Sequence, residues 1–326
     1  MRLNLKSRLL SGFFVGYKKI DLILQLVKSR HAMKFSAIVL AILSYGGLSA
    51  QDYTFKVLIN KGQNEIKSGN DWIAIKVGES LQSTDELRIS QNGYLGLVHV
   101  SGKPLEVKKA GVHKVADLAG SLTPGSSVLH KYTDFILSSK TENNSSLTAT
   151  GAVYRGDFDI KVYLPKSQNV VYSDDVIIAW AKDAKAKKYI VKFNSMFGDE
   201  LEKREVADTT FSLKLDGARL LKEDNILVEV SDAGDARRVS ETFVLKKLSS
   251  ADKKRINTSL REIAAQMKEA TALNQLLLAA FYEQNSLLID ASTALQQAIR
   301  LAPNIPDFQE AYRDFLVRNA LVDPKK

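Results

Sequence analysis

The chain contains no cysteine among its 326 residues. Disulfides, thiolate metal sites, cysteine nucleophiles and a lipid-modified cysteine behind an export signal are therefore excluded. Histidine is scarce, and the three histidines after residue 51 are too far apart for the spacing of metal ligands: His99, His113 and His130. The sequence shows no phosphate-binding glycine loop, nucleophile elbow, zinc-helix motif or calcium loop. We therefore expect a protein that is not an enzyme, with no bound metal, no cofactor and no catalytic residue.

The chain is also short of long hydrophobic runs. The apolar stretch from Phe35 to Leu43 has nine residues, whereas a membrane-spanning helix needs ~20. Lys34 precedes this stretch and small residues up to Ala50 follow it, which is the layout of a secretory signal peptide. We predict a signal at 33–50 that is cleaved after Ala50. Residues 1–32 are then either untranslated, with Met33 as the true start, or a short cytoplasmic arm before an uncleaved anchor.

The positive charge of the chain lies mainly in its first 50 residues. They hold eight Lys or Arg and one acid, so the rest of the chain holds 38 basic and 36 acidic residues. Such a nearly neutral body exerts no general attraction on phosphate groups. Nucleic acid is therefore excluded from the expected partners.

Alternating apolar and polar residues from 52 to 115 predict short antiparallel strands. Asn92-Gly93, Ser101-Gly102 and Ala110-Gly111 supply the positive φ that tight hairpin turns need. We therefore predict a small all-β domain over 51–126. Its expected strands are Tyr53–Ile59, Trp72–Ile75, Glu86–Ile89, Tyr94–Val100, Pro104–Lys108 and Val112–Val115.

Five short motifs in this region occur in a recognisable order: Lys61-Gly62, Asp71–Ile73, Val77–Leu81, Asp85–Ile89 and Asn92–Leu97. Their order resembles the periplasmic β-domain of the FecR family. In regulator members of that family, this domain follows an inner-membrane helix and contacts the signalling part of an outer-membrane transporter. The present chain lacks a cytoplasmic anti-sigma segment of useful length, so the resemblance implies the fold more directly than the signalling role.

The middle of the chain is predicted to contain a connector and a second β-domain. Residues 127–157 read as a short helix up to Ser139 followed by a polar linker from Lys140 to Gly151, with a loop at 118–126 before them. Residues 158–248 hold seven or eight short strands, the first at Ile160–Leu164, which is typical of an immunoglobulin or fibronectin type III sandwich. Trp180, with Tyr189 nine residues later, is similar to the core tryptophan of fibronectin type III domains.

After Ser249 the apolar period changes to 3.6, which predicts a helical domain over 249–322 and a tail at 323–326. Ser249 and Asp252 form a plausible capping pair for the first helix. Three further helices are expected at 272–284, 287–301 and 306–319, with Pro306 in the first turn of the last one.

These helices carry a spacing that is typical of the tetratricopeptide repeat. Its structural positions follow one another at steps of nine, four, three and five residues: Tyr282, Ala291, Leu295, Ala298 and Pro303. A generic helical bundle is the alternative. Because concave faces of helical repeats bind peptides or helices, we predict partner contacts at four residues of the first helix in each pair: Asn274, Leu277, Phe281 and Glu310.

Taken together, the sequence predicts a multidomain protein with a FecR-like β-domain, an immunoglobulin- or fibronectin-like sandwich and tetratricopeptide-like helices. The expected function is a non-catalytic adaptor or scaffold in the periplasm or cell envelope of a Gram-negative bacterium. Its expected partners are envelope proteins or peptides, bound without disulfides or a small-molecule cofactor. Two alternatives stay open: a FecR-type regulator that keeps residues 33–50 as an anchor, and a glycan-binding module.

Overall fold

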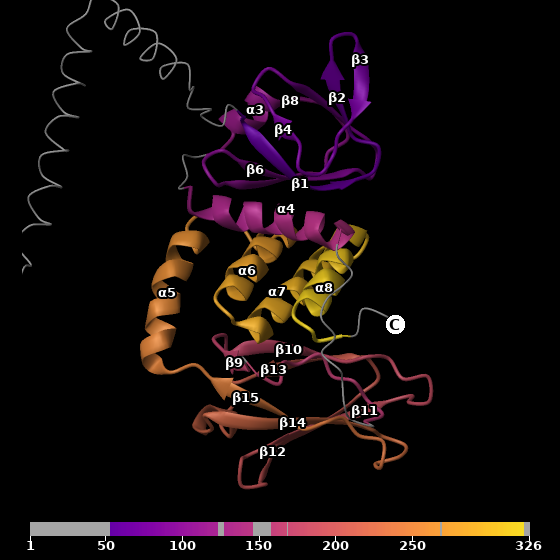
Figure 1. Cartoon of the computed structure of the whole chain (residues 1–326), viewed down its shortest axis with the longest axis vertical. Coiled ribbons are helices and arrows are strands. Elements are labelled where there is room, and N and C mark those ends of the chain that lie inside the picture. Colours follow the sequence, from indigo (N-terminus) through magenta and orange to yellow (C-terminus); the bar gives the residue numbers. More distant parts are fainter. Residues whose placement is uncertain (1–52, 123–126, 146–157, 168, 268, 323–326) are drawn as a thin grey trace, which may run out of the picture. The chain divides into compact units, whose positions relative to one another are not determined.

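The computed structural model describes residues 53–122, 127–145, 158–167, 169–267 and 269–322. The predicted signal at 33–50, the upstream segment 1–32, the tail 323–326 and the later part of the predicted linker lie outside these residues. The described part belongs to one compact unit. Its β-sheets in the N-terminal and central regions are followed by helices, so the predicted order of β regions and a helical C-terminal region is confirmed (Figure 1). None of its helices is long and apolar enough to cross a membrane.

The first β region consists of two four-stranded antiparallel sheets. One has the strand order β4-β1-β6-β7 and the other β3-β2-β5-β8. Alternating burial puts one side of each sheet into a common core that includes Phe55, Leu87 and Leu97. The strands are β1 Phe55–Lys61, β2 Glu65–Ser68, β3 Asp71–Ala74, β4 Ser80–Leu81, β5 Glu86–Ile89, β6 Tyr94–His99, β7 Pro104–Val107 and β8 Gly111–Lys114.

Two predictions for the connector region were wrong. A short helix, α3 (Val115–Gly120), occupies residues that were predicted to end a strand and begin a loop. Its six residues are too few for a helical period to show in the sequence. The predicted short helix is present but longer: a 3₁₀ turn, η1 (Ser127–Leu129), leads into the 16-residue helix α4 (His130–Ser145), which takes in Lys140–Ser145 of the predicted linker. Apolar residues of α4 are covered by other parts of the chain, and this long-range packing sustains a helix that propensity alone does not indicate.

The second β region has a five-stranded sheet in the order β12-β11-β14-β15-β9 and the antiparallel pair β10-β13. The predicted first strand at Ile160–Leu164 is represented only by isolated bridges, Ile160 to Ser240 and Val162 to Trp180. Trp180 is buried against the ring of Tyr189, as predicted for a core aromatic. The elements are β9 Val170–Val171, β10 Asp175–Ala179, β11 Tyr189–Asn194, β12 Glu200–Val206, β13 Thr210–Lys214, η2 Leu220–Lys222, β14 Asn225–Asp232 and β15 Phe243–Lys247.

The C-terminal helices begin and end within a residue or two of their predicted bounds. They are α5 Ser250–Ala264, α6 Ala272–Gln284, α7 Leu288–Leu301 and α8 Pro306–Arg318. The predicted cap is present, since Ser249 Oγ accepts a hydrogen bond from the Asp252 N–H. Pro306 is the first helical residue of α8, as expected.

The helices share one hydrophobic core with the first β region. This core joins residues of β1 and β6 to residues of α4, α6, α7 and α8. The rings of Tyr94 in β6 and Phe308 in α8 pack edge to face, with their centroids 5.9 Å apart. Helix α7 also contacts the second β region. Asp290 of α7 accepts hydrogen bonds there, at Oδ2 from the Tyr172 N–H at 2.9 Å and at Oδ1 from the Ser173 N–H at 2.8 Å. The helical segment therefore joins the two β regions (Figure 1).

Candidate functional site

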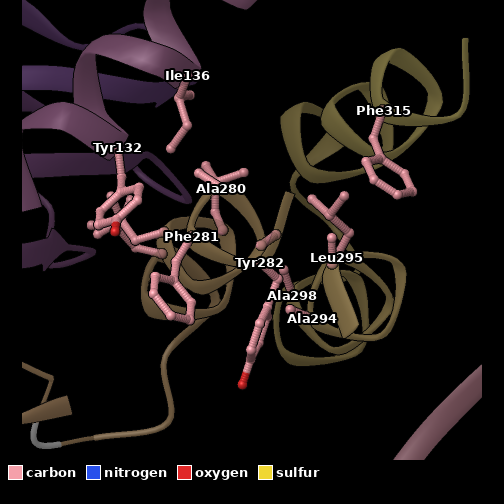
Figure 2. Close-up of a cluster of buried hydrophobic side chains, with 14 of the residues drawn as sticks. Tyr132, Ile136, Ala280, Phe281, Tyr282, Ala294, Leu295, Ala298 and Phe315 are labelled. Carbon is pink, nitrogen blue, oxygen red and sulfur yellow. The ribbon is translucent and has the colours of Figure 1, made fainter. Parts of the chain in front are cut away.

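Three of the four predicted partner-contact residues are buried in this structure. Leu277 and Phe281 are fully buried and Asn274 is 5% exposed, while Glu310 is exposed on α8. Helix α4 of the same chain covers this surface. Figure 2 shows Tyr132 and Ile136 of α4 pointing toward Ala280 and Phe281 of α6. The rings of Tyr132 and Phe281 pack edge to face, with their centroids 5.8 Å apart. The predicted open concave face is therefore already occupied by the chain itself.

The sequence did contain a signal for this burial. Helix α6 is apolar nearly all round, and a helix of that kind is expected to be covered on all sides. The tetratricopeptide-like positions behave as the predicted packing requires: Ala291 and Ala298 are fully buried where α6 and α7 approach, and Tyr282 and Leu295 lie between these helices (Figure 2). Pro303 is exposed in the connection from α7 to α8.

A cleft of about 470 Å³ lies where β7 meets the start of α6. One wall is formed by Lys103, Pro104, Leu105 and Glu106, which are consecutive in the chain. Side chains of consecutive strand residues point to opposite faces of a sheet. A cleft lined by consecutive residues therefore runs along the edge of the strand, because one face of the sheet would present only every second residue. Strand β7 is indeed the last strand of its sheet. The cleft therefore borders an unpaired strand edge.

The β6–β7 hairpin fixes which backbone groups point to that edge. The Gly102 N–H donates to His99 O at 2.7 Å and the His99 N–H donates to Lys103 O at 2.8 Å, with Gly102 at φ 82°. This is a three-residue loop with its glycine in the left-handed region. Hydrogen-bonded pairs then recur every second residue, so Leu105 and Val107 bond to β6. The backbone groups of Pro104 and Glu106 point away from it.

Proline at an outward position agrees with this register, because a proline in a sheet is tolerated where its missing N–H would face away from the neighbouring strand. The Glu106 N–H and C=O and the Pro104 C=O are thus the free groups of the β7 edge. Among the described residues, the Glu106 N–H donates no backbone hydrogen bond in a turn, loop or helix cap. Pro104 was predicted as the start of a strand, and its edge position could have been inferred from the sequence.

The carboxylate of Glu106 holds the floor of the cleft together. Its Oε1 accepts hydrogen bonds from the Tyr94 hydroxyl at 2.7 Å and the Leu273 N–H at 2.9 Å, while Oε2 is paired with Lys108 Nζ at 2.5 Å. Burial alone would raise the pKa of Glu106, but the bonds from Lys108, Tyr94 and Leu273 outweigh it and lower the pKa below its ordinary value. The Glu106 carboxylate thus accepts from a free N–H of the first turn of α6, although Glu106 and Leu273 are 167 residues apart in the sequence.

Opposite Glu106 on β6 is Gly96, which lets α6 approach the sheet closely. A Cβ at this position would lie 3.1 Å from Ile59 Cβ and 3.3 Å from Leu273 Cδ1. The absence of a side chain at Gly96 therefore sets the distance between the sheet and α6, and with it the width of the cleft.

Two polar side chains of the cleft have unused hydrogen-bonding capacity. Lys103 is 7% exposed, and no described residue forms a hydrogen bond or ion pair with its ammonium group. The Asn274 amide nitrogen donates to Glu269 O at 2.6 Å, whereas its carbonyl oxygen has no partner among the described residues. The Asn274 oxygen is itself buried, so the Lys103 ammonium group is the one of these two groups that a ligand in the cleft could reach.

Two other groups of buried or partly buried charged side chains are paired within the fold. The Asp290 carboxylate is held by backbone N–H groups of the segment before β10. Burial raises its pKa, although several hydrogen bonds oppose this shift. Arg238 is paired with Asp159, Asp183 and Asp232. Among the described residues, no group of three or more His, Asp or Glu side chains is arranged to hold a metal ion. These clusters hold elements together and leave the β7–α6 cleft as the candidate site.

No protein-family model and no curated protein matches this chain. The candidate site therefore depends on its own geometry: the edge of β7 and the Lys103 ammonium group beside one cleft.

Proposed function

We propose that the chain is a non-catalytic, exported protein of the bacterial cell envelope that acts as an adaptor or scaffold between envelope proteins. Its first β region is FecR-like, its second is an immunoglobulin- or fibronectin-like spacer, and its helices are tetratricopeptide-like. The signal at 33–50 and the FecR-like motifs support the location. The β7–α6 cleft supports the binding role.

The observation that carries this proposal is that one cleft is walled by two regions far apart in the sequence. Its edge comes from β7 and its opposite side from the start of α6, and Glu106 ties the two together. A partner in the cleft contacts both regions at once. In this proposal the helices act mainly as the rigid support of the cleft, because α4 covers the face on which we had expected the partner.

Site-specific photo-crosslinking in living cells tests the adaptor function. A photoreactive amino acid replaces Ser121, which is exposed at the rim of the cleft, and in a matched strain it replaces Ser83, an exposed turn residue of the first β region. We expect ultraviolet light to produce a discrete protein adduct from position 121 and none from position 83. Absence of any adduct from position 121 at native expression levels would contradict the proposal.

A FecR-type regulator is the second candidate, favoured by the resemblance together with the basic arm before the apolar stretch. The two functions differ in the N-terminus of the protein in its host. Intact-mass measurement is expected to show a chain that begins at Gln51 for the exported adaptor. A chain that retains Met33 or Met1 would favour the membrane-anchored regulator.

A further inference from the structure

We propose that the β7–α6 cleft binds an extended polypeptide segment as an additional strand on β7, with an acidic group of that segment at Lys103. This inference rests on the adaptor function and names the chemistry of its partner. The geometry that leads to it is the edge of β7, which pairs with no further described strand, beside a cleft in which the Lys103 ammonium group has no partner among the described residues.

The strand edge determines the backbone of the ligand. An incoming strand can donate to the C=O groups of Pro104 and Glu106 and accept from the Glu106 N–H, which continues the ladder of the sheet. The four residues of β7 span about 13 Å. The cleft of about 470 Å³ lies within the range of roughly 300–1,000 Å³ that is usual for ligand sites. The ligand is therefore a short extended segment and not a folded surface.

The side chains determine the polarity of the ligand. The ammonium group of Lys103 requires an acceptor, and a carboxylate is the strongest one that a peptide offers. Lys108 is already paired with Glu106, so Lys103 is the cation available for the acidic group.

Strand β12, another edge strand, is less suited to this role. It carries Glu200, Glu202, Lys203, Arg204 and Glu205. Dense charge of both signs is a usual protection of sheet edges against pairing. The β7 edge lies beside a cleft instead, where a pairing strand is enclosed by α6 and the end of α3.

Peptide selection provides the test. The purified full chain is used to select binders from a phage-displayed library of random linear peptides, and the strongest binder is synthesised. We expect enriched peptides to carry an acidic residue. Lys103→Gln should weaken the synthesised peptide about tenfold or more, as expected for loss of a hydrogen bond between charged groups. Lys109→Gln, an equal change of charge at an exposed neighbour outside the cleft, should change the affinity less than twofold.

An N-methyl scan of the peptide then tests strand pairing directly. Methylation of every second amide, those facing β7, should abolish binding, whereas methylation of the alternate amides should be tolerated. Four results would each overturn the inference: no enriched peptide, equal affinity for Lys103→Gln, no period of two in the scan, or competition by millimolar inorganic phosphate that reveals a simple anion site. If position 121 still forms adducts in cells, the adaptor function survives any of these results.

Discussion

The Glu106 carboxylate provides the most quantitative test of how the first β region is joined to the helices. We consider Glu106→Gln, which keeps the size of the side chain. The glutamine oxygen can still accept from Tyr94 and Leu273, but both bonds lose the contribution of a charged acceptor, roughly 1 kcal/mol each. The pair with Lys108, which is largely exposed, adds little. The expected loss of unfolding free energy is therefore about 2 kcal/mol.

Differential scanning calorimetry at pH 7 measures this loss, which corresponds to a decrease of the melting temperature by about 3 °C for a chain of this size. Glu65→Gln is the matched control. Glu65 pairs with Arg88 on the open side of the sheet, where both side chains are partly exposed, so its loss should stay below about 1 kcal/mol.

The same variant makes a prediction about pH. Because the folded pKa of Glu106 is lowered, the stability that its charge contributes is fully present above the unfolded pKa and is lost as the pH falls through the folded pKa. The difference between the native chain and Glu106→Gln should therefore shrink between pH 5 and about pH 3. Equal stability of the two proteins at pH 7, or a difference that grows toward low pH, would refute the reasoning.

Three further substitutions test other contacts in the fold. Asp290→Ala leaves two partly buried backbone N–H groups without acceptors and should cost about 2 kcal/mol in urea denaturation. Asp117→Ala, also in a first helical turn but exposed, should cost less than about 1 kcal/mol. Gly96→Ala forces a Cβ between the sheet and α6 and should destabilise by about 1–3 kcal/mol, while Gly120→Ala, with open space around it, should be neutral or stabilising by the same measurement. Arg238→Gln should lower the melting temperature at pH 7, and by less in acid, where the three carboxylates that it faces become protonated.

The sequence predicted local structure well where the local signal was strong. The apolar period and the Ser249 cap placed the C-terminal helices, and turn glycines such as Gly102 placed most strands of the first β region. Trp180 was recognised as a core residue by its position in an apolar strand. The predicted strand at Ile160–Leu164 and the predicted start of the linker at Lys140 were wrong, because the pairing and packing partners of these segments are remote in the sequence.

The candidate site was not predictable in the same way. The spacing that indicated a tetratricopeptide-like pair also suggested an open face at Asn274, Leu277 and Phe281. Whether an apolar helix face is open depends on what the rest of the chain places against it. Helix α4 covers that face, and its own sequence gives only a weak helical signal.

The sequence by itself determined the C-terminal helices, most strands of the first β region, the absence of cysteine chemistry, and the turn that makes β7 a strand with Pro104 at its start. Only the tertiary structure decided that a cleft lies beside this strand and that its Glu106 binds the first turn of α6. The physical reason is that hydrogen-bond periodicity and capping are local, whereas a cleft forms where two distant segments pack together without filling the space between them.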